Sequence, residues 1–118
     1  MLARFTQIDY DREMALIATV ERDGREVELG VCRYITNPDG ASCEFAVVIA
    51  DDQHSRGLGR RMMTLLIAVA RTHGLQTMMG HVLGSNCGML SLCQNLGFVI
   101  ADNAEDPMVK RVTLALKS

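Results

Sequence analysis

The chain has 118 residues, 48% of them apolar and 22% charged, and a formal net charge of −2 at pH 7. This length and composition are typical of one globular domain, expected over residues 1–118, and the charge gives no footprint for binding nucleic acid or an anionic membrane. No apolar run is long enough to cross a bilayer, and residues 1–5 lack a signal-peptide pattern, so we expect a cytoplasmic protein.

The first half of the chain predicts mainly strands. Residues 2–7 are compatible with a short helix, and residues 9–12 with a loop. Three strands joined by Gly-containing turns follow, over residues 14–20, 27–35 and 42–50. The third of these strands is apolar on both faces, so we expect it to lie centrally in the sheet.

The second half alternates helices with strands. A helix over about 57–73 ends at Gly74, and its apolar stripe consists of Leu58, Met62, Leu65, Leu66, Val69 and Ala70. A second helix, capped by Ser85 or Asn86 and closed by Gly97, directs Met89, Leu90, Cys93 and Leu96 inward. Strands are expected over residues 77–83, 98–101 and 109–116. The order (α)βββαβαββ predicts an α/β fold with a mixed sheet, not a doubly wound one.

The turn Arg56-Gly57-Leu58-Gly59 lies between an apolar strand and a helix N-terminus. The first N–H groups of a helix have no carbonyl partner, and the helix dipole adds positive charge there. Glycines let an anion approach the backbone, so the turn predicts a site for a phosphorylated ligand. The Lys-Ser/Thr that ends a nucleotide P-loop is absent, and Met62 replaces the third glycine of a dinucleotide fingerprint.

The four cysteines favour neither a zinc site nor disulfides. They contain no C-x-x-C pair, and three of them lie in apolar or helical stretches, where a free cysteine behaves as a small core residue. We therefore expect reduced thiols and no metal centre.

Several stretches together resemble the GCN5-related N-acetyltransferase (GNAT) family. They are residues 44–49, 56–59, 83–86, 89–90 and 96–98. In their order and spacing they are most similar to the acetyltransferase domain of bacterial protein-lysine acetyltransferases, over about residues 4–116. The resemblance implies a mixed, mostly antiparallel sheet with flanking helices that lacks the family's usual first strand and helix. It also implies either a piece of a larger multidomain enzyme or a homo-oligomer, because a sheet edge and an apolar patch would lie uncovered.

The resemblance implies acetyl-CoA, or coenzyme A, as the phosphorylated ligand. Its expected contacts are Val47, Val48, Ile49, His54, Ser55, Arg56, Gly57, Leu58, Gly59, Arg60 and Asn86. Asn86 is equally readable as a plain helix N-cap, since Asn is favoured there. For Arg60 and Arg61, a solvated helix face is the alternative to phosphate contact.

The resemblance also implies that Glu44 is the general base, directly or through a water. A lysine ammonium cannot attack a thioester until it loses a proton, and Glu44 is the only acid between Ala41 and Ala50. In apolar surroundings its carboxylate would suit that task. The acceptor is then an amine, with a protein lysine favoured over a small amine. Cys93 occupies the position where many family members have a tyrosine acid, and a non-catalytic acyl-CoA-binding module is the alternative function.

Overall fold

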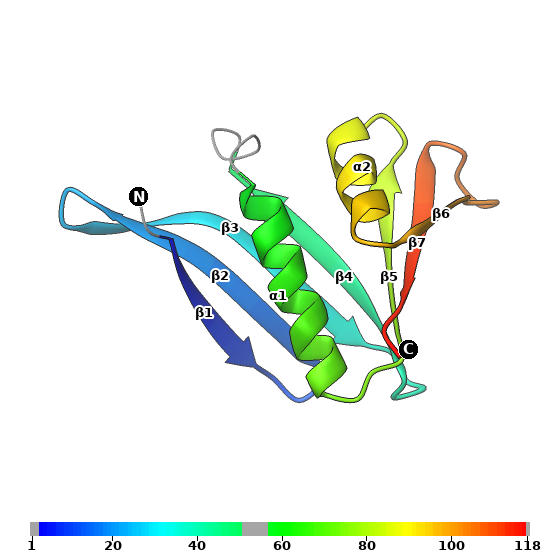
Figure 1. Ribbon diagram of the computed structural model, residues 1–118, viewed down its shortest axis with the longest axis horizontal. Coiled ribbons are helices and arrows are strands. Elements are labelled where there is room, and N and C mark those ends of the chain that lie inside the picture. The colour runs from blue at the N-terminus through cyan, green and yellow to red at the C-terminus, as the bar shows by residue number, and fades with distance from the viewer. Residues whose placement is uncertain (1–2, 51–56, 118) are drawn as a thin grey trace.

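A computed structural model describes residues 3–50 and 57–117 as seven strands and two helices. These are β1 Arg4–Asp9, β2 Glu13–Arg22, β3 Arg25–Thr36, β4 Ser42–Ile49, α1 Leu58–Thr72, β5 Thr77–Leu83, α2 Cys87–Asn95, β6 Val99–Asp102 and β7 Val109–Ala115. The strands form one sheet in the order β1-β2-β3-β4-β5-β7-β6 (Figure 1). The predicted α/β class with a mostly antiparallel mixed sheet is confirmed, and β4 is central as expected.

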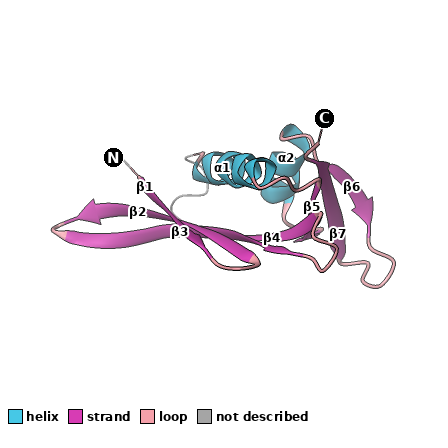
Figure 2. Ribbon diagram, turned by 90° about the horizontal axis from the view of Figure 1, so that it is seen from below, coloured by secondary structure: helices cyan, strands magenta, loops and turns pink. Residues whose placement is uncertain are grey.

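Both helices pack on the same face of the sheet, as Figure 2 shows from its edge. We call the opposite face the open face, since neither helix of the described residues covers it. On β4 the side chains of Phe45 and Val47 turn toward the helices, whereas those of Glu44 and Val48 are exposed on the open face. This alternation follows from the two-residue period of a strand.

Beyond its centre the sheet separates into two halves. β4 and β5 are the one parallel pair among the described strands, and their pairing stops after Glu44↔Met79. β4 nevertheless continues to Ile49, held by β3, and β5 continues to Leu83, held by β7. The two strands therefore diverge toward the end of the sheet where α1 begins and α2 lies (Figure 1).

Residues 4–9 differ from the prediction, because they form β1 and not a helix. β1 pairs antiparallel with β2 from Arg4↔Thr19 to Asp9↔Met14. Phe5 and Ile8 are three residues apart, a spacing typical of a helix face, which explains the wrong prediction. The extended state is favoured here because β1 pairs with the outer edge of β2, whose backbone groups on that side would otherwise lack partners.

The buried face of α1 is rotated slightly from the predicted stripe. Leu65 is 39% exposed and Val69 is only partly buried, whereas Met63 and Ile67 are buried. The remaining predicted residues Leu58, Met62, Leu66 and Ala70 are in the core as expected. The rows that begin at 58 and 59 and continue every four residues thus face the sheet.

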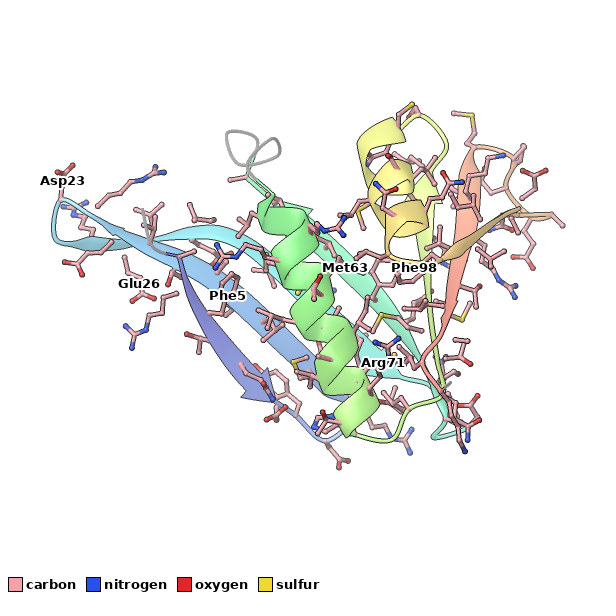
Figure 3. All side chains as sticks on the ribbon, in the orientation of Figure 1. Phe5, Asp23, Glu26, Met63, Arg71 and Phe98 are labelled. Atoms are coloured by element: carbon pink, nitrogen blue, oxygen red, sulfur yellow. The ribbon has the colours of Figure 1, made fainter. Side chains whose placement is uncertain are left out.

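The C-terminal end of α1 is fixed by contacts to two strands. His73 Nδ1 lies 2.7 Å from the hydroxyl of Tyr34 on β3. Arg71, labelled in Figure 3, donates from Nε to the carbonyl of Leu116 at 3.1 Å. Gly74 then ends the helix with φ of 80°, and Gly97 ends α2 with φ of 100°, as predicted. Within the part of the chain that the structure describes, no helix is both long and apolar enough to span a bilayer.

Candidate functional site

A groove of about 510 Å³ lies where β4 and β5 diverge, and the beginnings of α1 and α2 close it. Its walls are mainly apolar and include Val47, Val82 and Leu92. Arg60, His81 and Asn86 are its polar and charged lining residues. A long, largely apolar groove with a few polar groups is typical of a small-molecule site.

The N-terminus of α1 opens into this groove. Gly57 adopts a left-handed conformation with φ of 74°, and the first helical hydrogen bond runs from Arg61 N to the Gly57 carbonyl at 3.1 Å. The N–H groups of Leu58, Gly59 and Arg60 precede that bond, and within residues 3–50 and 57–117 neither a side-chain cap nor an acidic first-turn residue is found there. The helix start is therefore suited to an anion, as the glycine turn predicts.

Not every predicted residue of this turn faces the groove. Gly57, Gly59 and Arg60 line it, whereas Leu58 is not among the lining residues and its side chain is buried in the core. Arg61 lies outside the groove, with its guanidinium 4.9 Å from the centre of the Phe5 ring on β1. The predictions for His54, Ser55 and Arg56 lie outside the described residues.

Two glycines allow the elements around the groove to approach closely. A Cβ on Gly59 would lie 2.9 Å from Ile49 Cδ1, so the start of α1 rests directly on β4. A Cβ on Gly80 would lie 2.4 Å from the ring of Phe45, which itself packs against Phe98. These contacts hold the two diverging strands at their observed separation.

The hydrogen-bonding direction of β4 distinguishes the three predicted cofactor contacts on that strand. Ala50 N donates to the Leu29 carbonyl at 2.8 Å, and peptide groups alternate sides along an antiparallel strand. The even-numbered residue Val48 therefore turns its peptide toward β3, and its side chain is 72% exposed on the open face. Val47 and Ile49 turn their peptides toward the gap and line the groove.

Asn86 is a helix N-cap and also lines the groove, so its contact with the cofactor stays a prediction. Its Oδ1 accepts a hydrogen bond from Met89 N at 3.1 Å, which makes it the N-cap of α2. The same residue lines the groove, and its amide nitrogen can donate to a ligand there.

Glu44 lies at the point where the strands part, and its neighbour is a histidine that the sequence analysis did not single out. His81 Nδ1 on β5 is 3.0 Å from Glu44 Oε1, with side-chain exposures of 42% and 48%. The expected apolar surroundings are thus wrong, because this carboxylate is half-exposed beside an imidazole. Only the register of a parallel pair brings residues 44 and 81 together, so no local pattern could have found His81.

The remaining predicted features concern cysteines and metals. Cys32, Cys43 and Cys93 are buried free thiols, as expected, and burial raises the pKa of Cys93 to about 11. A neutral core thiol at position 93 cannot replace a tyrosine acid that faces the groove. Among the described residues, no three His, Cys, Asp or Glu side chains gather as metal ligands would.

Comparison with known proteins gives consistent matches. Residues 2–98 match the acetyltransferase (GNAT) family. An acetyltransferase from Pseudomonas aeruginosa is 39% identical over 106 residues, which cover 90% of this chain and 57% of the relative. The chain therefore spans little more than half the length of that relative.

Two solved structures have a similar fold. The GNAT domain of S. lividans PAT superposes with a TM-score of 0.76 at 20% identity, over 91% of this chain and 64% of that one. The structure of yncA from Salmonella typhimurium with its cofactor acetyl-CoA gives a TM-score of 0.73 at 20% identity, over 90% and 66% of the two chains.

Proposed function

The chain belongs to the GNAT family of acetyltransferases, and from that premise we propose that it transfers the acetyl group of acetyl-CoA to an amine, with a protein lysine as the favoured acceptor. The observation that carries this proposal is one groove with two chemically different ends. One end is the N-terminus of α1, suited to an anion, and the other is His81, which the Glu44 carboxylate contacts where β4 and β5 separate.

The described residues fit coenzyme A. Among the described residues, no atom lies within 4 Å of the position that a Cβ on Gly57 would take, so these residues leave room for a phosphate at the start of α1. Arg60 adds a positive charge on the groove wall, and Val47 offers its peptide to an extended arm lying between the strands. Bound there, acetyl-CoA supplies the activated acyl group as a thioester.

The chain's own residues then have two tasks. The groove orients the thioester toward the parting of the strands, which removes much of the entropic cost of the reaction. Glu44 serves as the general base, directly or through an intervening group, because the attacking amine must first lose a proton. No nucleophile–base pair for a covalent intermediate lies among the described groove residues, so we propose direct transfer.

Calorimetric titration with CoA and acetyl-CoA tests the binding half of the proposal. Thiol release from acetyl-CoA in the presence of a lysine peptide or a polyamine tests the transfer half and separates the two acceptor classes.

Glu44→Gln should lower kcat at least 100-fold while leaving acetyl-CoA affinity within threefold. Glu28→Gln, at an exposed glutamate of β3, is the matched control. Equal rates for wild type and Glu44→Gln would remove Glu44 from this role.

A second candidate function is an acyl-CoA-binding module without turnover, because the groove that would hold the cofactor suffices for that function. CoA binding without thiol release for any amine would support this second function.

Free cysteines are typical of a reducing compartment, and we propose that the protein acts in the cytoplasm under either function.

A further inference from the structure

His81 is the member of the Glu44–His81 pair that lines the groove. Its imidazole belongs to the groove wall together with Val82 and Leu83, whereas Glu44 is not among the lining residues. Glu44 approaches His81 from β4, with Oε1 3.0 Å from Nδ1. The imidazole therefore stands between the carboxylate and the groove.

The pair bridges the two strands at the point where they separate. Glu44↔Met79 is the last position at which β4 and β5 pair, and His81 is two residues further along β5 on the same face as Met79. Any ligand lying between the strands must end near this last paired position, because residues 42–44 of β4 and 77–79 of β5 are hydrogen-bonded to each other. The imidazole is thus placed at the closed end of the groove.

The contact to Glu44 determines which nitrogen of His81 can act as a base. An ionised carboxylate beside Nδ1 favours the tautomer in which Nδ1 carries the proton, and Nε2 then keeps a lone pair. Among the described residues, the charged groups beside His81 are Glu44 on β4 and Arg111, its cross-strand partner on β7, and Arg60 on α1 lines the same groove. Glu44 balances the charge of an imidazolium, which Arg111 alone would oppose.

We propose that His81 accepts the proton of the acceptor amine through Nε2, while Glu44 holds Nδ1–H and stabilises the imidazolium; this rests on the acetyl transfer proposed above. It makes His81, not a water, the group through which Glu44 acts. An ammonium acceptor loses two protons overall. The first passes to Nε2 and on to solvent, which frees the nitrogen lone pair. As the N–C bond forms and the C–S bond breaks, the second goes to the departing thiolate.

Chemical rescue tests the proposal. His81→Ala should lower kcat at least 50-fold and leave the KM for acetyl-CoA within threefold. Added imidazole should then raise the kcat of this variant at least tenfold. His81→Gln should be equally slow but insensitive to imidazole, because its amide can fill the space and donate to Glu44 but cannot accept a proton. Ala101→Gln, at an exposed position of β6, should stay within twofold of wild type.

A second readout does not depend on turnover. Nitrogen-15 NMR of the full chain should show His81 as the Nδ1–H tautomer in the wild type and as a mixture in Glu44→Gln. A wild-type Nε2–H tautomer would overturn the proposal, as would a His81→Ala variant that keeps a third of wild-type kcat while Glu44→Gln is inactive. That last result would leave Glu44 as base through a water and the proposed function intact. CoA binding without any transfer by the wild type would overturn both.

Discussion

At the scale of single residues, Gly80 tests how tightly Phe45, which lines the groove, is packed. A methyl group at this position would lie 2.4 Å from the Phe45 ring, which is 6% exposed and also packs against Phe98. Because the ring has little room to move, Gly80→Ala should destabilise the fold by about 1–3 kcal/mol in urea unfolding. Gly84→Ala, whose methyl would meet the Met108 carbonyl at 3.5 Å, is the control and should cost less. Equal stabilities would mean that Phe45 can leave its site.

The buried thiols give a second prediction. Burial raises the pKa of Cys32 and Cys43 to about 12 and that of Cys93 to about 11, whereas Cys87 is exposed. At pH 8 each buried thiol is ionised in on the order of one molecule in a thousand or fewer, and the thiolate is the reactive form. Iodoacetamide should therefore label one cysteine of the native protein and all four after denaturation, as read by mass spectrometry. Rapid labelling of two or more sites in the native state would contradict this.

The same pKa values set the direction of a pH dependence. Each folded-state pKa lies above the ordinary thiol value of 9.0. Between about pH 9 and 12 the unfolded chain therefore binds fewer protons than the folded chain, so the free energy of unfolding falls as pH rises. In Cys43→Ser, position 43 should not contribute to this fall in the free energy of unfolding, because a serine hydroxyl does not ionise in this pH range.

At the scale of elements, alanine substitutions at the two ends of α1 should affect CoA binding differently. Gly57 and Gly74 both have positive φ, 74° and 80°, and a Cβ at either position would meet no atom of the described residues within 4 Å. Alanine should thus cost each position a similar amount, about 1–2 kcal/mol of conformational energy. Only the methyl at position 57 would enter the groove beside the helix N–H groups. Gly57→Ala should therefore weaken CoA binding at least tenfold by calorimetry, and Gly74→Ala should leave it unchanged.

Should both alanine variants bind CoA with wild-type affinity, the helix start would not be the phosphate site. Should both weaken binding equally, the effect would come from loss of stability. The paired design separates these outcomes because the two glycines differ only in which end of α1 they occupy.

The elements themselves were largely predictable, for reasons that differ along the chain. β5 is found with its predicted bounds, and α2 begins after its predicted Asn86 cap, because turn and cap residues act locally. β1 was not predictable, since its six residues have no strand pattern of their own and depend on β2 for partners. The buried stripe of α1 was predictable only in part, since Met63 and Ile67 are buried and the predicted Leu65 is exposed.

Backbone geometry alone predicts only part of the candidate site. The glycine turn between a strand and a helix predicts an anion site, which stays a prediction, whereas the resemblance to a family was needed to single out Glu44. His81 could not be found, because its contact depends on where the parallel pairing of β4 and β5 ends. The exclusion of the Val48 peptide from the groove depends on the same long-range register.

At the scale of the whole molecule, the sheet has one covered face and one open face. The exposed apolar side chains of Ile35, Val48 and Leu83 lie on the open face, on the three strands at the centre of the sheet. Glu44 and His81 lie on the same face. Apolar surface beside the Glu44–His81 pair is more stable in contact with an acceptor or a second protein surface than exposed to water.

We therefore expect this chain to self-associate through the open face at micromolar concentration, with a dimeric or larger mass by light scattering. Val48→Lys places a charge at a position that is 72% exposed on central β4, so it should shift the mass toward the monomer. Met108→Lys changes an equally exposed residue, 71%, in the loop after β6 and should leave the mass unchanged. A monomeric wild type would contradict the expectation. Because self-association would cover Glu44 and His81, raising the protein concentration should also lower the specific activity of the wild type but not of Val48→Lys.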